Sequence, residues 1–141
     1  MNVEECFQKK LLKKIPSDRL KADASLRVAE HQLVHAHELF AEEFVNDALI
    51  HVYMSMFHAA RSLLYQDGVQ EKSHYAIYIY LFERYSDKFS PEIIESFQVY
   101  QKERHNILYG LNGNVSKEEV EQSFEDAESF LQEVRRTHGA L

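Results

Sequence analysis

Apolar residues recur along residues 18–43 at alternating spacings of four and three positions. This spacing places them on one face of an α-helix and predicts a long amphipathic helix over that range. Pro16 ends any preceding helix, and Ser17-Asp18 supplies side-chain oxygens that can cap the new one. The residues expected to face inward are Ala22, Leu26, Ala29, Leu33, Ala36 and Phe40.

Two more helices are predicted between residues 46 and 89. Asn46-Asp47 can cap the first, and Gly68 fits its C-terminal end because glycine tolerates the left-handed conformation found there. The second follows the polar stretch 70–73. The residues expected to face inward are Leu49, Tyr53, Met56, Ala60, Leu63 and Leu64 in the first, and Tyr78, Leu81, Phe82, Tyr85 and Phe89 in or just after the second.

Two final helices complete the chain. Ser90-Pro91 opens one of them, since a proline in the first turn has no helical N–H to lose, and this helix ends near Gly110. A turn is expected at residues 112–114, and the capping box at 116–119 opens the last helix. The expected inner residues are Ile93, Phe97, Tyr100, Ile107 and Leu108, followed by Val120, Phe124, Ala127, Leu131 and Val134.

Amphipathic helices joined by short connections pack as an antiparallel bundle, because each must bury its apolar face against its neighbours. The sequence therefore predicts an all-α fold, an antiparallel bundle of four to five helices. Residues 17–141 would form a single domain, preceded by a basic N-terminal leader at residues 1–16. Only four glycines and two prolines interrupt the chain, which favours long helices over many short strands.

Charge is distributed unevenly. Residues 1–21 carry six basic and three acidic side chains, whereas the remainder carries ten basic and twenty acidic ones. Broad binding of duplex nucleic acid requires many cations, so we expect any nucleic-acid contact to be local. It would use the basic leader or a small cleft. The simpler interpretation of the leader is a solvated, frayed helix.

No apolar run reaches the length of a membrane span, and the N-terminus lacks the continuous apolar core of a signal peptide. The single cysteine, Cys6, excludes an intramolecular disulfide framework, and without a positioned base it is a poor candidate nucleophile. We therefore expect a cytoplasmic protein that contacts no membrane. The sequence indicates no cofactor.

Arg104 interrupts the apolar face of the fourth of these five helices. Burying an unpaired cation costs several kcal/mol, so the guanidinium needs an anionic partner or an open cleft. One interpretation is a structural salt bridge to a glutamate of a neighbouring helix. The other is an anion site, because the planar guanidinium can donate two parallel hydrogen bonds to a phosphate.

Two further patterns allow alternative interpretations. His31 and His35 share a helical face near Glu38 and could hold a metal, but the chain lacks a second clear ligand pair, so we predict no metal site. The aromatic residues in the middle of the chain most simply form core and dimer surface, with a base-stacking platform as the alternative. They are Tyr75, Tyr78, Tyr80, Phe82 and Tyr85.

The segment Arg104-His105-Asn106-Ile107-Leu108-Tyr109 resembles the HEPN signature, an arginine followed by a polar residue, three further residues and a histidine. Upstream, Phe57-His58-Ala59-Ala60-Arg61 with Gly68 and Lys72-Ser73-His74 resembles a small prokaryotic branch of that family. The resemblance covers roughly residues 20–136. It implies a HEPN-like bundle that forms a homodimer, with a minimal nucleotidyltransferase as its partner in a toxin–antitoxin-like pair.

Family ribonucleases are understood to work without metal, with arginine and histidine facing each other across a dimer cleft, but this sequence has Tyr109 in place of that histidine. Histidine side chains titrate near pH 6.5 and tyrosine side chains near 10, so only histidine suits proton transfer at neutral pH. His105 is a second candidate, although adjacent helical residues point about 100° apart and it cannot occupy the position of Tyr109. Some family members are modified on a tyrosine near this motif, but in a different register.

The leading hypothesis is a HEPN-type module that binds RNA or nucleotide phosphate through Arg104. Catalytic roles for Arg104, Tyr109 and His105 are secondary candidates. His58, Arg61 and His74 either line the same cleft or make inter-helix hydrogen bonds. The rival hypotheses are an active metal-independent endoribonuclease and a purely structural or adaptor bundle.

Overall fold

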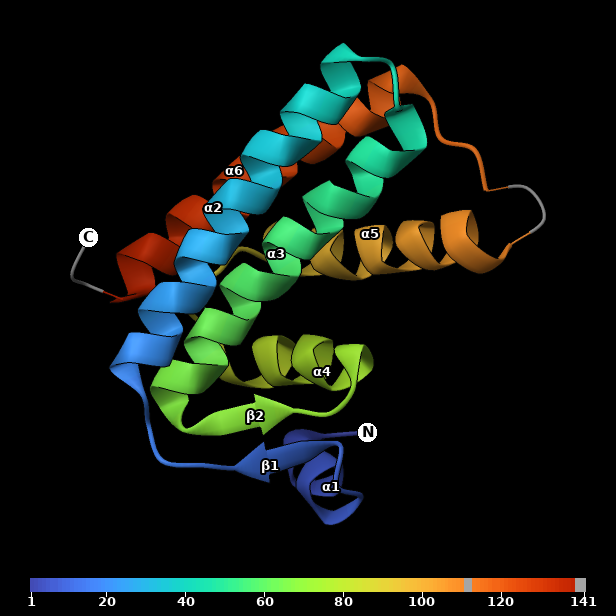
Figure 1. The fold of residues 1–141 in the computed structure, drawn as a ribbon. Helices are drawn as coiled ribbons and strands as arrows, with labels where there is room; N and C mark the ends of the chain where they lie inside the picture. Colours follow the sequence, from blue (N-terminus) through green and yellow to red (C-terminus); the bar gives the residue numbers. More distant parts are fainter. Residues whose placement is uncertain (111–112, 139–141) are drawn as a thin grey trace.

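The computed structural model describes residues 1–110 and 113–138 (Figure 1). Within them the chain forms helices and one short antiparallel strand pair, so the prediction of an all-α bundle is confirmed with a small sheet added. In chain order the elements are α1 (Val3–Gln8), β1 (Leu12–Lys14), α2 (Arg19–Ala41), α3 (Val45–Asp67), β2 (Val69–Glu71), α4 (His74–Arg84), α5 (Pro91–Tyr109) and α6 (Lys117–His138).

Helices α2, α3 and α6 form the main bundle, with aligned axes in Figure 1. Alanines at 22, 29 and 36 of α2 are completely buried, and their small side chains let α2 pack closely against α3. The expected inner residues of these three helices are buried, except that Phe40 is half-buried. The apolar periodicity thus predicted the bundle interior well.

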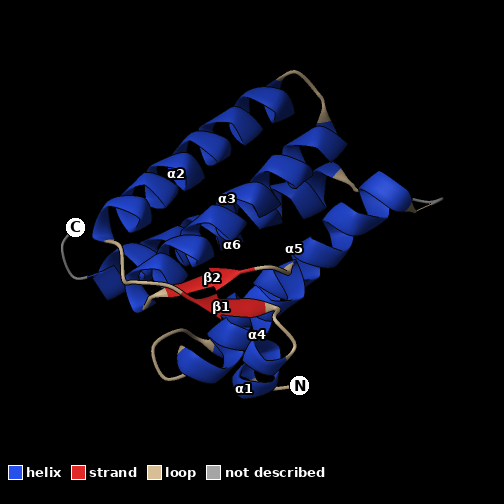
Figure 2. Ribbon diagram, turned by 60° about the horizontal axis from the view of Figure 1, so that its bottom comes forward, coloured by secondary structure: helices blue, strands red, loops and turns tan. Residues whose placement is uncertain are grey.

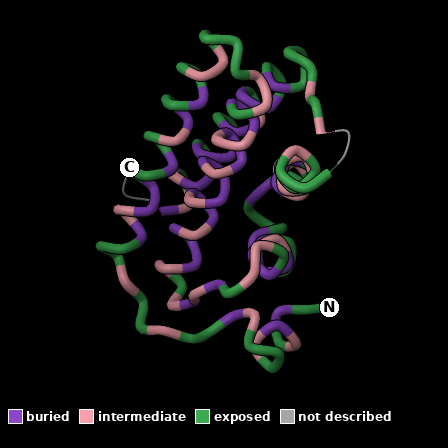
Figure 3. Tube along the Cα trace, turned by 45° about the vertical axis from the view of Figure 1, so that its right-hand side comes forward, coloured by how far each residue is buried: buried purple, intermediate pink, exposed green. Residues whose placement is uncertain are grey.

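Helices α4 and α5 run across this bundle, and the C-terminal half of α5 extends past α3 (Figure 1). Along the inner face of α5, Phe97 is 0% exposed and Tyr100 7%, but Leu108 is 43% exposed. Figure 3 shows the same change from buried to exposed along the helix. The prediction that Leu108 is buried is therefore wrong, because α5 outruns the helices that would cover it. Phe82 on α4 is also exposed rather than buried.

Capping residues confirm three of the predicted helix starts. The side chains of Asp18, Ser90 and Ser116 accept hydrogen bonds from backbone N–H groups of the first turns of α2, α5 and α6. The expected cap at Asn46-Asp47 is wrong, because α3 begins at Val45. Asn46 instead bonds to residues 114 and 115, which ties the start of α3 to the segment before α6. The turn expected at residues 112–114 lies partly outside the described residues.

The leader at residues 1–16 is folded onto the rest of the chain and is not a solvated helix. Val3 and Cys6 of α1 are fully buried, and the Val3 N–H donates to the Glu83 carboxylate of α4. Strand β1 pairs antiparallel with β2, which directly follows α3. Figure 2 brings this end forward and shows β1 beside β2, with α1 and α4 adjoining. Backbone pairing and two buried anchors therefore fix the basic segment in place.

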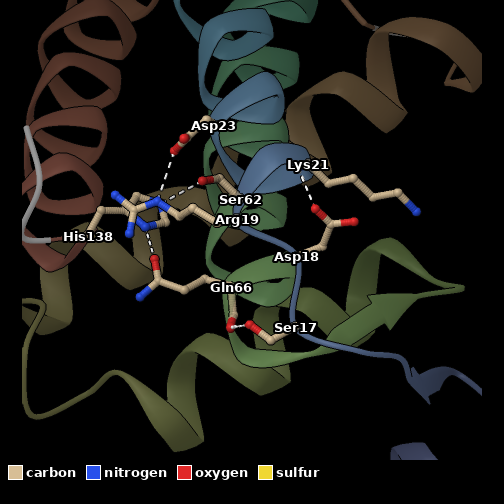
Figure 4. A network of polar contacts seen from close by, with 8 residues as sticks. All are labelled: Ser17, Asp18, Arg19, Lys21, Asp23, Ser62, Gln66 and His138. Carbon is tan, nitrogen blue, oxygen red and sulfur yellow. Dashed lines mark hydrogen bonds and ion pairs between the residues drawn. The ribbon is translucent and has the colours of Figure 1, made fainter.

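A buried polar network joins the C-terminal end of α6 to α3 and the start of α2 (Figure 4). His138 is 6% exposed, and its ring nitrogens contact the Ser62 hydroxyl at 2.6 Å and the Gln66 side-chain amide. The Gln66 carbonyl accepts from the Ser17 hydroxyl. Burial, reinforced by nearby Arg19, lowers the pKa of His138, so the imidazole is neutral at pH 7. None of the helices described here is both long enough and apolar enough to cross a membrane.

Candidate active site

Arg104 lies on the inner face of α5, where that helix begins to leave the bundle. Its guanidinium carbon is 5.7 Å from the centre of the Tyr53 ring of α3, a cation–π contact. Its Nε atom is buried without a hydrogen-bond partner, and no carboxylate of the described residues forms an ion pair with it. In this part of the chain the structural salt bridge that would explain a buried arginine is therefore not formed.

His74, the first residue of α4, joins Arg104 through Tyr53. The Tyr53 hydroxyl and His74 Nδ1 are 2.7 Å apart, and the imidazole stacks on Phe57 with ring centres 4.3 Å apart. Burial lowers the pKa of His74, and the charges of Arg104 and Arg61 lower it further, so the ring is neutral at pH 7. Burial also raises the pKa of Tyr53, whose phenol stays protonated and can donate to Nδ1. With Nδ1 accepting, the second nitrogen carries the proton and becomes a donor.

A cleft of about 440 Å³ opens between the start of α4 and the C-terminal half of α5. None of the described residues that line it is acidic, although the whole chain has a net charge of −7. Gln101 Oε1, like Arg104 Nε, is buried without a partner, so an acceptor and a donor are both left unpaired at this cleft. The lining residues are His74, Tyr75, Gln98, Gln101, Lys102, Arg104, His105 and Asn106. Such a cleft suits an anion that also offers hydrogen-bond donors.

Arg61 lies near this cleft but already has an anionic partner. Its Nε is 2.9 Å from a carboxylate oxygen of Glu71, whose side chain is only 7% exposed. The Nε hydrogen does not point at that oxygen, so the contact is an ion pair without a directed hydrogen bond. The guanidinium also covers the rings of Phe57 and Tyr65. Arg61 therefore supports the wall of the site, and its charge is largely matched by Glu71.

His58 is half-buried on α3, one turn before Arg61. Burial lowers the pKa of its imidazole, with a smaller effect from Arg61, and its ring contacts Phe57 edge to face. It does not line the cleft. Of the four predicted residues, His74 and Arg104 line the cleft, whereas Arg61 and His58 do not.

Tyr109 and His105 are placed differently from Arg104. Tyr109 is 72% exposed at the end of α5 and does not line the cleft, whereas His105 does. The two rings lie 5.0 Å apart. Tyr109 lies five positions after Arg104 on the helix, which turns the two residues about 140° apart and moves them about 7.5 Å along the axis. Within one chain they do not face the same cavity.

The remaining sequence candidates do not form a second site among the described residues. His35 contacts Glu38 at 3.6 Å and lies against His51, and no described group of three side chains could hold a metal ion. Cys6 is buried, and burial raises its pKa, so its thiol stays protonated. Of the aromatic residues, Tyr80 and Tyr85 are buried, and their hydroxyls both donate to Asp67.

Tyr53, Gln101, Lys102 and Glu71 contribute to the site but were missed as functional candidates. Tyr53 was expected only as core, because its helical position matches the apolar face. Gln101 and Glu71 carried no signal, since isolated polar residues are common in helices and turns. Tyr53 could have been flagged because a buried tyrosine hydroxyl needs a partner.

Comparisons with known proteins identify the family of the chain. No curated protein matches the chain. The sequence profile described as the HEPN domain matches residues 22–137, which include Tyr53, His74 and Arg104 and exclude α1 and β1. Because this match covers most of the 141 residues, the protein belongs to the HEPN domain family.

Proposed function

We propose that this protein is a HEPN module that binds a phosphate of RNA or of a nucleotide at the cleft between α4 and α5. Membership of the family supports a nucleotide- or RNA-related module in general. The observation that carries the proposal is the state of Arg104, which lies beside an open cleft with its Nε unpartnered and without a described carboxylate. A phosphate would supply the acceptors that the fold leaves out.

The neighbours of Arg104 support the same ligand class. The proton-bearing nitrogen of neutral His74 would donate a second hydrogen bond, and Lys102 adds a positive charge at the rim. Gln101 also lines the cleft, and its side-chain amide would hydrogen-bond a ribose hydroxyl or a base. Tyr53 holds both His74 and Arg104 and is a positioning residue.

We further propose that the module works as a homodimer beside a minimal nucleotidyltransferase, as in toxin–antitoxin pairs. The exposed C-terminal half of α5 supports a dimer, since Leu108 and Tyr109 present apolar surface there. Across such an interface the Tyr109 of one subunit could approach the Arg104 of the other. Sedimentation showing only monomers of 16.6 kDa at micromolar concentration would contradict this part of the proposal.

A metal-independent endoribonuclease is the second candidate function. The observation that favours it is that His74 lies in the same cleft as Arg104, so the site does contain a histidine. However, the hydrogen bond from Tyr53 occupies Nδ1 and leaves the other nitrogen as a donor, which is unsuited to accept a proton from a 2′-hydroxyl. The proposal therefore favours binding over cleavage.

The test is binding of fluorescently labelled RNA and of a labelled nucleotide, measured by anisotropy. Arg104→Ala should reduce affinity at least tenfold while leaving the helical circular-dichroism spectrum unchanged. Arg27→Ala, which removes an exposed arginine of α2, is the matched control and should bind like the parent. Unchanged affinity in folded Arg104→Ala would remove the proposal and favour the structural or adaptor alternative.

Cleavage is tested in the same samples by incubating RNA with the protein in the presence of EDTA. We expect no cleavage above that of a protein-free control. Cleavage that Arg104→Ala and His74→Ala both abolish would establish the ribonuclease alternative instead.

A further inference from the structure

A second cavity, also of about 440 Å³, lies beside α1 and β1. Most of its lining residues precede the HEPN match, and one follows β2. Four lysines line it, together with Phe7 and Leu12, and none of the described lining residues is acidic. The lysines are Lys10, Lys13, Lys14 and Lys72. We call these four residues the lysine cluster.

The lysine cluster is held in place by backbone structure. Lys13 and Lys14 belong to β1 and pair with residues 70 and 69 of β2. The Lys72 N–H donates to the Leu11 carbonyl at 2.8 Å, which extends this pairing by one step. Lys14 also lies over the Phe7 ring, with its Nζ 5.7 Å from the ring centre. The backbone thus brings four like-charged side chains to one cavity although their charges repel, and a polyanion would relieve that repulsion.

The chain connects the lysine cluster directly to the Arg104 cleft. Only Ser73 separates Lys72, in the cluster, from His74, in the cleft, so their Cα atoms are at most about 7 Å apart. Ser73 has extended backbone angles, and residues on either side of an extended residue point to the same side of the chain. Lys72 and His74 therefore mark two neighbouring positions of one positively charged path.

We infer that this path binds single-stranded RNA, with one phosphate at Arg104 and the adjoining phosphates on the lysine cluster. This inference rests on the proposed function and narrows its ligand from any nucleotide to a strand several residues long. Lysine ammonium groups on flexible stems suit successive phosphates of a strand. The rest of the chain is strongly acidic, which confines an anionic strand to this path.

The test compares a labelled RNA of about twelve nucleotides, a length typical of single-strand binding sites, with a labelled dinucleotide. The variant K10Q/K13Q/K72Q removes three cluster charges and keeps Lys14 on Phe7. Its matched control is K21Q/K88Q/K117Q, which makes the same change in net charge at positions outside both cavities. Affinity is measured over a range of salt concentrations, with melting temperature as the check on folding.

We expect the cluster variant to lose at least tenfold in affinity for the longer RNA and nothing for the dinucleotide. The slope of log affinity against log salt should become shallower by about 2, because each phosphate contact on a single strand contributes about 0.7. The control triple variant should keep most of the affinity and show a smaller change in slope.

Three results would overturn the inference. The first is equal loss in both triple variants, which would mean a net-charge effect. The second is a parent protein that binds the longer RNA no more tightly than the dinucleotide. The third is that polyglutamate of matched charge displaces the RNA and that the cluster variant no longer binds polyglutamate. This result would assign the path to an acidic protein instead of RNA. Unchanged dinucleotide binding in Arg104→Ala would overturn the proposed function alone.

Discussion

Replacing Arg104 by methionine should not lower the free energy of unfolding. The substitution removes a cation–π contact with Tyr53 worth about 0.5–2 kcal/mol. It also removes a buried, unpartnered N–H, which costs the folded state about 1–3 kcal/mol. A methionine sulfur against the same ring restores about 0.3–1.5 kcal/mol. The two gains exceed the loss at their midpoints by roughly 1.7 kcal/mol, so we expect the free energy of unfolding to stay the same or to rise by up to about 2 kcal/mol.

Arg61→Met is the matched comparison, because it removes an arginine that covers two aromatic rings and has a carboxylate partner. Without Arg61, the nearly buried Glu71 carboxylate is left unpaired, which should cost about 2–4 kcal/mol. The lower end allows for the partial exposure of Arg61. The two substitutions are chemically identical, so the contrast between them isolates the effect of the carboxylate.

Urea unfolding followed by far-ultraviolet circular dichroism measures both changes, since the chain has no tryptophan. A single domain of this size should unfold in one transition, and equal slopes against urea would show that the variants expose the same surface. A loss above about 3 kcal/mol for Arg104→Met would mean that Arg104 serves an internal ion pair. The reasoning for an open anion site would then be refuted.

Tyr53→Phe keeps the ring beneath Arg104 but removes the phenol that bonds to Nδ1 of neutral His74. The pKa of His74 should therefore rise, although burial and the charges of Arg104 and Arg61 still hold it below its ordinary value; an unchanged or lower pKa in an NMR titration would contradict the proposed hydrogen bond. His138→Gln should reduce the loss of stability between pH 7 and 5. Below about pH 6.5 the unfolded state binds a proton at His138, whereas the folded state, in which the pKa of His138 is lowered, does not. If urea unfolding shows the same pH dependence in the variant and the parent, His138 is not the source of that loss. Lys10→Gly should stabilise the fold by about 0.5–1 kcal/mol, because Lys10 has a φ of 61°, yet should weaken RNA binding. Glu43→Gly, at a position with a φ of 67°, is the control and should raise the melting temperature similarly without changing RNA affinity. Equal RNA affinity in the two glycine variants would argue against RNA binding by the lysine cluster.

The fold was largely predictable because helix periodicity depends on local sequence. Two kinds of prediction were correct, because periodicity and capping both act within a few residues. They are the inner faces of α2, α3 and α6 and the caps at residues 18, 90 and 116. The strand pair was not predictable, because residues 12–14 become a strand only through pairing with residues 69–71. The exposure of Leu108 depends on how far α5 extends past α3, which its own sequence does not encode.

The site was predictable in its members but not in its arrangement. Arg104 was identified because a cation interrupts an apolar face, and His74 and Arg61 because of the family resemblance. Their environments depend on tertiary contacts: Arg61 is matched by Glu71, whereas Arg104 lies over Tyr53 and has no described carboxylate. The folded chain, and not the sequence, shows which of the two arginines has a carboxylate partner among the described residues.

The central claim is that Arg104 binds a phosphate of RNA. It is tested most directly by NMR observation of the Arg104 Nε–H group. The signal is assigned by its loss in Arg104→Met and followed while a short single-stranded RNA is added. We predict a downfield shift of the Arg104 signal that saturates with RNA binding, because a phosphate held by the guanidinium group polarises all of its N–H bonds. RNA binding that leaves the Arg104 signal in place would contradict the account.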